Sequence, residues 1–159
     1  MTMKTLRILL SFLFAPAFII TANAQIKGDD LKSAINSGNF IFEAQTVSPA
    51  SGSVRQLTGD YYTLKVSKDA VVSDLPYFGR AFTAPIDPTK GGLEFKSAKF
   101  QYSVNNKKNS WQVNIKPNDL NGDGIQLFMT VYDNGSASLQ VTSVNLQPIS
   151  FDGFIEAKK

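Results

Sequence analysis

The chain has 159 residues, of which 18% are charged, and a formal net charge of +3 at pH 7. It contains no histidine and no cysteine, which excludes Ser-His-Asp and Cys-His catalysis, His/Cys zinc sites, and haem or iron–sulfur centres held by these side chains. The small charge excess, without a broad basic region, also argues against nucleic-acid binding.

The first 24 residues have the three parts of a secretory signal peptide. Lys4 and Arg7 form a positive start, an apolar run follows over 8–20, and the segment 22–24 is Ala-Asn-Ala. The run is shorter than the about 20 residues of a membrane span and contains a proline. We therefore expect cleavage after residue 24 and a periplasmic or secreted protein that is soluble afterwards. With no cysteine to carry a lipid, and no later apolar segment, we expect neither a lipid anchor nor a membrane span.

The remaining residues, 25–159, are predicted to form a single β-rich domain. Its one helix is expected over about 29–37, because Leu31, Ala34 and Ile35 share a helical face. An aspartate begins this helix and Gly38 ends it. The helix is short and amphipathic, so it should pack on a sheet.

Period-two alternation predicts about eight strands in the rest of the domain. They are expected at about 39–45, 61–66, 69–73, 99–104, 110–115, 126–132, 136–143 and 149–157. The segment 76–92 is interpreted as irregular, and a bulge or kink is expected at Gly153. Short strands of this kind indicate a mainly antiparallel sheet that curls into a sandwich or a partly open barrel.

The pair Asn134-Gly135 joins two of these strands and is preferred in two-residue type I′ turns. The residues that such a turn would direct into the core are Phe128, Thr130 and Tyr132. The apolar residues left on the other face, opposite polar partners, are Leu127, Met129 and Val131. That row would be covered either by the N-terminal helix or by a ligand or partner, which makes it a second-choice groove.

The run from Asp119 to Gly124 resembles the opening of a calcium loop, with candidate ligands Asp119, Asn121 and Asp123. The twelfth position of such a loop should be a glutamate, but it is Thr130 here. The alternative is a polar turn rich in Asn, Asp and Gly. No cofactor is expected apart from this weak indication of Ca²⁺.

The segment 76–82 holds three aromatic residues and an arginine between Pro and Gly residues. Tyr77, Phe78 and Arg80, with Tyr61 as an outward neighbour, could grip a sugar ring or a peptide by stacking and cation–π contact. The alternative is that the aromatic side chains close one end of the core. Both interpretations stay open on the sequence alone.

Two long segments resemble a secreted bacterial family, the domain-of-unknown-function group 4251. They run from Gly59 to Ala81, including Leu-Pro-Tyr-Phe-Gly-Arg-Ala at 75–81, and from Asn134 to Gly153. The resemblance implies an envelope or secreted location. It implies no activity, cofactor or catalytic residue, because none is established for the family.

These observations predict a non-catalytic binding or envelope-associated module whose ligand is an unknown envelope protein, peptide or glycan. One alternative is a carboxylate-dependent hydrolase acting on envelope glycans, which would need two acids across a cleft. The carboxylates are dispersed along the sequence, so no pair can be placed. Another alternative is a purely structural envelope or inhibitor protein.

Overall fold

The computed structural model describes residues 25–59, 61–82, 93–120, 122 and 124–156. The predicted signal peptide, 1–24, lies outside these residues. The described part holds one helix and ten strands: α1 (Gly28–Ser37), β1 (Phe40–Pro49), β2 (Arg55–Gln56), β3 (Thr63–Val66), β4 (Val71–Leu75), β5 (Leu93–Ser97), β6 (Phe100–Asn106), β7 (Ser110–Pro117), β8 (Gln126–Tyr132), β9 (Ser136–Thr142) and β10 (Ile149–Glu156).

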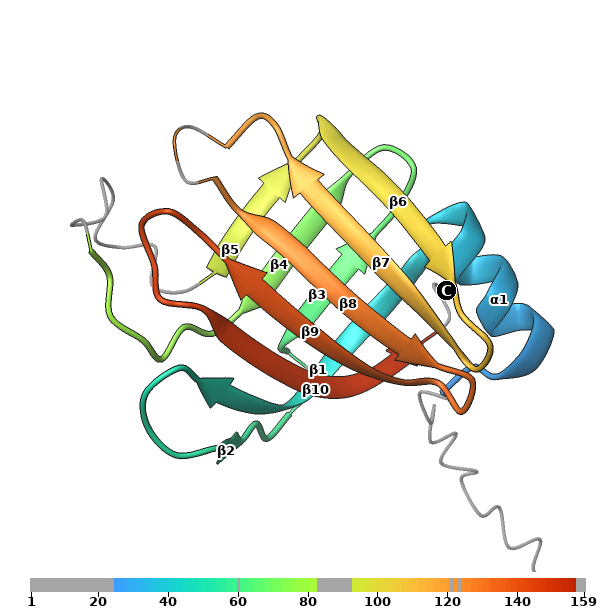
Figure 1. The fold of residues 1–159 in the computed structure, drawn as a ribbon, viewed down its shortest axis with the longest axis horizontal. Coiled ribbons are helices and arrows are strands. Elements are labelled where there is room, and N and C mark those ends of the chain that lie inside the picture. Colours follow the sequence, from blue (N-terminus) through green and yellow to red (C-terminus); the bar gives the residue numbers. More distant parts are fainter. Residues whose placement is uncertain (1–24, 60, 83–92, 121, 123, 157–159) are drawn as a thin grey trace, which may run out of the picture.

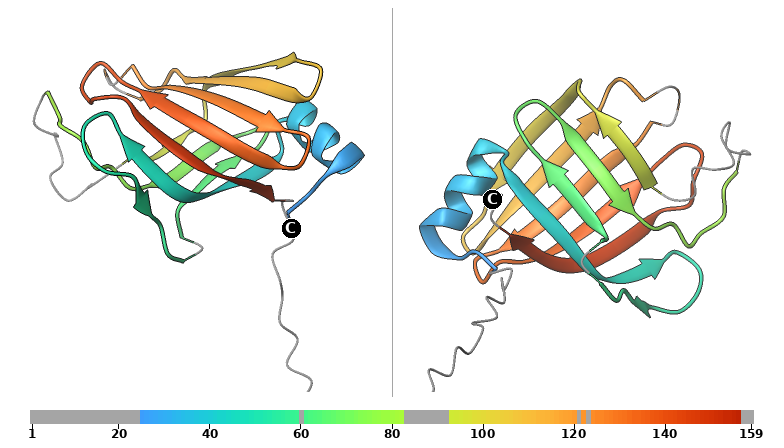
Figure 2. Two further views of the ribbon diagram at one scale, coloured as in Figure 1. Left: turned by 60° about the horizontal axis from the view of Figure 1, so that its bottom comes forward. Right: turned by 180° about the vertical axis from the view of Figure 1, so that it is seen from behind.

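All ten strands belong to one antiparallel sheet that is nearly closed into a barrel (Figure 1). The order is β5-β4-β3-β1-β10-β9-β8-β7-β6, with β2 paired to the far part of β1. The two ends of this order, β5 and β6, follow each other in the chain, so the curled sheet brings its two edge strands to a common corner without pairing them (Figure 2). The predicted fold class, mainly antiparallel β with one helix, is confirmed.

The described part has ten strands rather than the predicted eight, and the two missed strands are β2 and β5. β2 has only two residues, which is too short to show alternation. In β5 the inward positions are Leu93, Phe95 and Ser97, and the serine interrupts the apolar pattern although it is fully buried. Because of this buried serine, the apolar alternation of β5 cannot be recognised in the sequence.

Helix α1 lies at one end of the barrel, where Leu31 and Ile35 are fully buried (Figure 2). It ends at Gly38, whose φ of 62° is left-handed and whose N–H donates to the last turn of the helix. The Tyr102 hydroxyl of β6 donates to the Ile35 carbonyl oxygen at 2.5 Å. Burial raises the pKa of Tyr102, so this hydroxyl remains protonated and fixes the helix on the barrel.

The β8–β9 hairpin corrects one prediction. The Gly135 N–H donates to the Tyr132 carbonyl at 2.9 Å, and Gly135 has a φ of 86°. A type I′ turn needs positive φ at both central residues, yet no described residue other than glycine has positive φ. The loop thus has three residues, 133–135, with Gly135 in the left-handed position that follows a type I turn.

The extra loop residue shifts the strand register by one and exchanges the two faces of β8, so that Phe128 and Tyr132 are exposed and not in the core. Val131 pairs with Ala137, Met129 with Leu139 and Leu127 with Val141. The row Leu127, Met129 and Val131 is 1%, 2% and 0% exposed. The prediction that this row forms a surface groove is wrong, because the row lines the packed interior of the barrel.

The expected irregularity near Gly153 lies mainly on the neighbouring strand. The register between β1 and β10 shifts between Ala44 and Thr46, so Gln45 is the extra residue, opposite Gly153 and Asp152. At Gly153 a Cβ atom would overlap the backbone carbonyl of Glu43. Glycine is required here because two backbones approach closely.

Candidate functional site

The aromatic loop singled out in the sequence, 76–82, lies along the β9–β10 connection at the end of the barrel away from α1 (Figure 1). The Phe82 N–H donates to the Asn145 carbonyl at 2.7 Å, and the Gln147 N–H donates to the Arg80 carbonyl at 3.1 Å. These bonds and the bridge between Ala81 and Leu146 fasten two loops that are distant in sequence.

Two of the four predicted contact residues are anchored to the protein itself, and one of them, Tyr77, contributes to this fastening. The Tyr77 hydroxyl lies 2.8 Å from the Arg80 carbonyl oxygen and 3.1 Å from that of Gln147, and burial raises its pKa. Phe78 is half-buried against the core, and the Arg55 guanidinium lies 4.7 Å from the centre of its ring. Their geometry supports the structural interpretation for Tyr77 and Phe78.

The other two predicted contact residues point into solvent. Arg80 is exposed, and Tyr61 has an exposed fraction of 77%. Phe82, in the same loop as Arg80, is 66% exposed. The hypothesis that this end of the barrel contacts a ligand therefore depends on Arg80 and Tyr61 rather than on the anchored pair.

Of the predicted calcium ligands, Asn121 and Asp123 lie outside the described residues. Asp119 is described, and its carboxylate closes the corner between β5 and β6. It accepts hydrogen bonds from the Ser97 hydroxyl, from the Ala98 N–H at 2.8 Å and from the Lys99 N–H at 3.1 Å. These bonds, that of Ser97 above all, hold the pKa of Asp119 below its ordinary value. No group of three or more acidic side chains that could hold a metal ion is found among the described residues.

One carboxylate pair bears on the hydrolase alternative. Asp74 of β4 and Glu94 of β5 are directly opposite each other on the outer face of the barrel. Both side chains are exposed. A glycosidase acid is held in an enclosing cleft that raises its pKa, so this exposed pair lacks the environment that the reaction requires.

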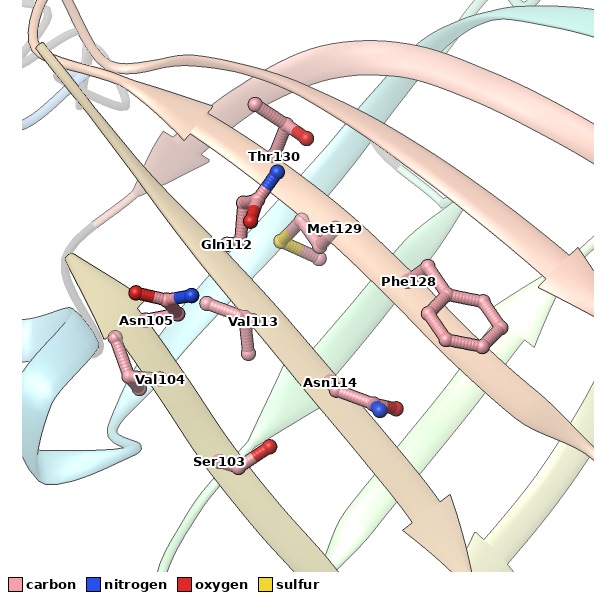
Figure 3. A pocket seen from close by; sticks show the side chains of 9 residues that line it. All are labelled: Ser103, Val104, Asn105, Gln112, Val113, Asn114, Phe128, Met129 and Thr130. Carbon is pink, nitrogen blue, oxygen red and sulfur yellow. The ribbon is translucent and has the colours of Figure 1, made fainter. Parts of the chain in front are cut away.

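A second surface lies on the outer face of β6, β7 and β8, where a shallow depression of about 400 Å³ crosses the three strands (Figure 3). Two rows of side chains border it, and the members of each row are paired across the strands. One row is Ser103, Asn114 and Phe128. The other row is Asn105, Gln112 and Thr130.

The residues between the two rows are Val104, Val113 and Met129. Val113 and Met129 are each 2% exposed because their side chains enter the core. The floor of the depression is therefore backbone, and its walls are amide, hydroxyl and phenyl groups. Phe128, with an exposed fraction of 40%, is the aromatic member of the lining.

The lining of this depression carries no charged or titratable side chain. Sequence reasoning treats such outward residues as an ordinary solvated face. A usable signal is present nonetheless: apart from Lys116, Phe128 and Tyr132, the outward positions of β6 to β9 are Asn, Gln, Ser or Thr, where lysine and glutamate are more usual on a solvated surface.

In the part of the chain that the structure describes, no helix is long and apolar enough to cross a membrane. A solved structure with a similar fold is a DUF4251 family protein from Bacteroides eggerthii. It has a TM-score of 0.56 and 16% sequence identity, and the match covers 81% of this chain and 86% of that one. No curated protein matches the chain. The model of the DUF4251 family, a domain of unknown function, matches residues 22–155, and the chain therefore belongs to this family.

Proposed function

We propose that the protein is a non-catalytic binding module that acts outside the cytoplasm, in the periplasm or after secretion. The observation that carries this proposal is the neutral depression on the outer face of β6–β8. It offers hydrogen-bond donors and acceptors and one aromatic ring. It offers no carboxylate, lysine or tyrosine that could act as a general acid or base, so the site is suited to holding a ligand and not to transforming it.

The tight packing of the barrel interior argues for a binding site on the outside of the barrel. Buried side chains of β1, β3, β4, β5, β7, β8, β9 and β10 form one packed cluster. Small barrels filled in this way have no room for a ligand inside. A ligand would therefore have to bind on the outer face or at the loops of one barrel end.

Retention of an envelope component on the immobilised protein tests the proposed function. The protein is produced from the full-length chain and challenged with an envelope extract of the organism that encodes it. We expect saturable retention of a component whose mass is unchanged after prolonged incubation. A change in its mass would indicate an enzyme, and the absence of any retained component would refute a binding function.

The same assay distinguishes the two candidate surfaces. Phe128→Ala removes the aromatic ring of the outer depression, whereas Arg80→Ala changes the exposed loop and leaves the Tyr77 anchor in place. We expect Phe128→Ala to weaken retention and Arg80→Ala to leave it unchanged. The opposite result would place binding at the loop end of the barrel.

We propose that the module needs no cofactor. The Asp119 carboxylate already accepts three hydrogen bonds from the β5–β6 corner, two of them on Oδ2, so little of its lone-pair capacity is left for a calcium ion. Calorimetric titration with Ca²⁺ should therefore give no heat of binding up to millimolar concentration. A saturable heat signal would show that the 119–124 segment binds the ion.

A further inference from the structure

We propose that the depression on β6–β8 binds a neutral glycan, with the sugar chain lying across the strands. The proposal rests on the proposed binding function and adds the ligand class and the contact residues (Figure 3). A second, smaller depression between α1 and β6 also has aromatic and hydroxyl side chains, but Lys68 gives its lining a charge.

The geometry favours an extended ligand that crosses the sheet. Rows of outward residues two positions apart along a strand are separated by about 7 Å, which is twice the rise per residue. Each row continues beyond the depression by strand pairing, Phe128 to Gln140 and Thr130 to Ser138 of β9. Four neighbouring strands at about 4.8 Å spacing give a track of about 14 Å.

The side chains that border this track match the hydroxyl groups of sugars. Asn105, Asn114 and Gln112 each present an amide with two N–H donors and a carbonyl acceptor. The hydroxyls of Ser103 and Thr130 can donate or accept. Sugar hydroxyls also act in both ways, and the face of the Phe128 ring can cover the C–H face of a sugar ring.

Charge argues against the competing ligand classes. An acidic glycan or phosphate is held by arginine or lysine, and the lining has neither. A nucleic acid needs several basic contacts for the same reason. The centre of a protein interface is enriched in aromatic residues, methionine and arginine, whereas this lining exposes a single aromatic ring amid amides and hydroxyls.

Affinity electrophoresis through gels that contain a soluble polysaccharide tests the proposal. The probes are the neutral polymers dextran, mannan, galactan and xylan, with polygalacturonate as the acidic comparison. We expect retardation by at least one neutral polymer and none by polygalacturonate. Phe128→Ala and Asn114→Ala should each weaken that binding, roughly tenfold for the loss of the stacking ring.

Tyr132→Ala is the matched control, because Tyr132 lies on the same strand, is 45% exposed and is outside the depression. This variant should bind as the unmodified protein does, and thermal unfolding checks that all three variants fold. No retardation by any neutral polymer, binding to polygalacturonate alone, or equal losses in Phe128→Ala and Tyr132→Ala would overturn the proposal. If an envelope protein is retained and lost with Phe128→Ala, the binding function stands and the glycan assignment is wrong.

Discussion

Asp119 shows how the role of one residue depends on partners that are distant in sequence. Its neighbours in the chain suggest a calcium ligand, but its carboxylate accepts hydrogen bonds from Ser97, Ala98 and Lys99, about twenty residues earlier. These bonds join the corner at which the sheet curls back towards its other edge. An Asp in a polar turn thus serves the closure of the barrel.

The lowered pKa of Asp119 predicts a pH-dependent contribution to stability. The folded pKa lies below the ordinary value of about 3.9, so the contribution is present above that pH and is lost as the pH falls through the folded pKa. We expect Asp119→Asn to lower the melting temperature at pH 7 and to lower it less at pH 3. The measurement is thermal unfolding by circular dichroism at both pH values.

Asp69→Asn is the control for this experiment, since Asp69 is an exposed aspartate in the β3–β4 turn. Its melting temperature should stay close to that of the unmodified protein at both pH values. Equal losses of melting temperature in Asp119→Asn at pH 7 and pH 3 would show that the charged carboxylate is not what stabilises the corner.

Gly153 is a second residue whose role depends on a distant partner, because the backbones of β1 and β10 approach each other closely at this position. Because an added Cβ would overlap the Glu43 carbonyl, Gly153→Ala must displace one backbone at the β1 bulge. We expect a loss of about 2–3 kcal/mol in the free energy of unfolding, as in other overpacked sites. Urea denaturation measures this loss.

Gly28→Ala provides the comparison for Gly153→Ala. Gly28 has a φ of 65° but no atom near its Cβ position, so the substitution costs only the left-handed backbone, about 1 kcal/mol. If the two variants lose the same stability, the steric explanation for Gly153 is wrong.

Among the elements, those with clear local signals could be predicted from the sequence. Helix α1 has three apolar residues on one face and a terminal glycine, and these signals give its bounds to within one residue. The β6–β7 hairpin alternates on both strands, and its register pairs Val104 with Val113 and Tyr102 with Ile115, as an inward apolar face requires.

The β8–β9 hairpin shows why the strand register and the outer depression could not be predicted from the sequence. Asn-Gly is compatible with a two-residue turn and with a three-residue loop that ends in a left-handed glycine. The two loops differ by one residue of register. β9 has a single apolar face, but β8 carries apolar residues on both of its faces, so the alternation of β8 does not choose between the two loops. The outer depression was missed for the same reason, because its walls form only after the register is fixed.

Substitution on either face of β8 tests this register. Met129 is buried opposite Leu139, so Met129→Ala should cost about 2–5 kcal/mol of stability by opening a cavity. Phe128 is 40% exposed, and Phe128→Ala should cost under about 1 kcal/mol. Denaturant titration compares the free energies of unfolding of the two variants. A larger loss for Phe128→Ala would favour the register of the two-residue turn.

At the scale of the whole molecule, the first described residues, Gln25 and Ile26, are bonded to the barrel. The Gln25 side-chain amide donates to the Asn134 carbonyl at 2.8 Å, and Gln25 also forms a bridge with Glu156. The Ile26 N–H donates to the Ile155 carbonyl. Cleavage at the predicted point, after Ala24, would leave Gln25 and its contacts at the start of the chain.

Export can therefore remove the N-terminal segment without disturbing these contacts. We expect the full-length chain, expressed in a Gram-negative host, to yield a periplasmic or secreted protein whose intact mass begins at Gln25. Ala24→Asp should block processing because signal peptidase requires a small residue there. The control Gln25→Ala should be processed normally. If the chain without substitutions is recovered uncleaved in the cytoplasm or the membrane, the predicted export is wrong. The location proposed for the binding module is then wrong as well.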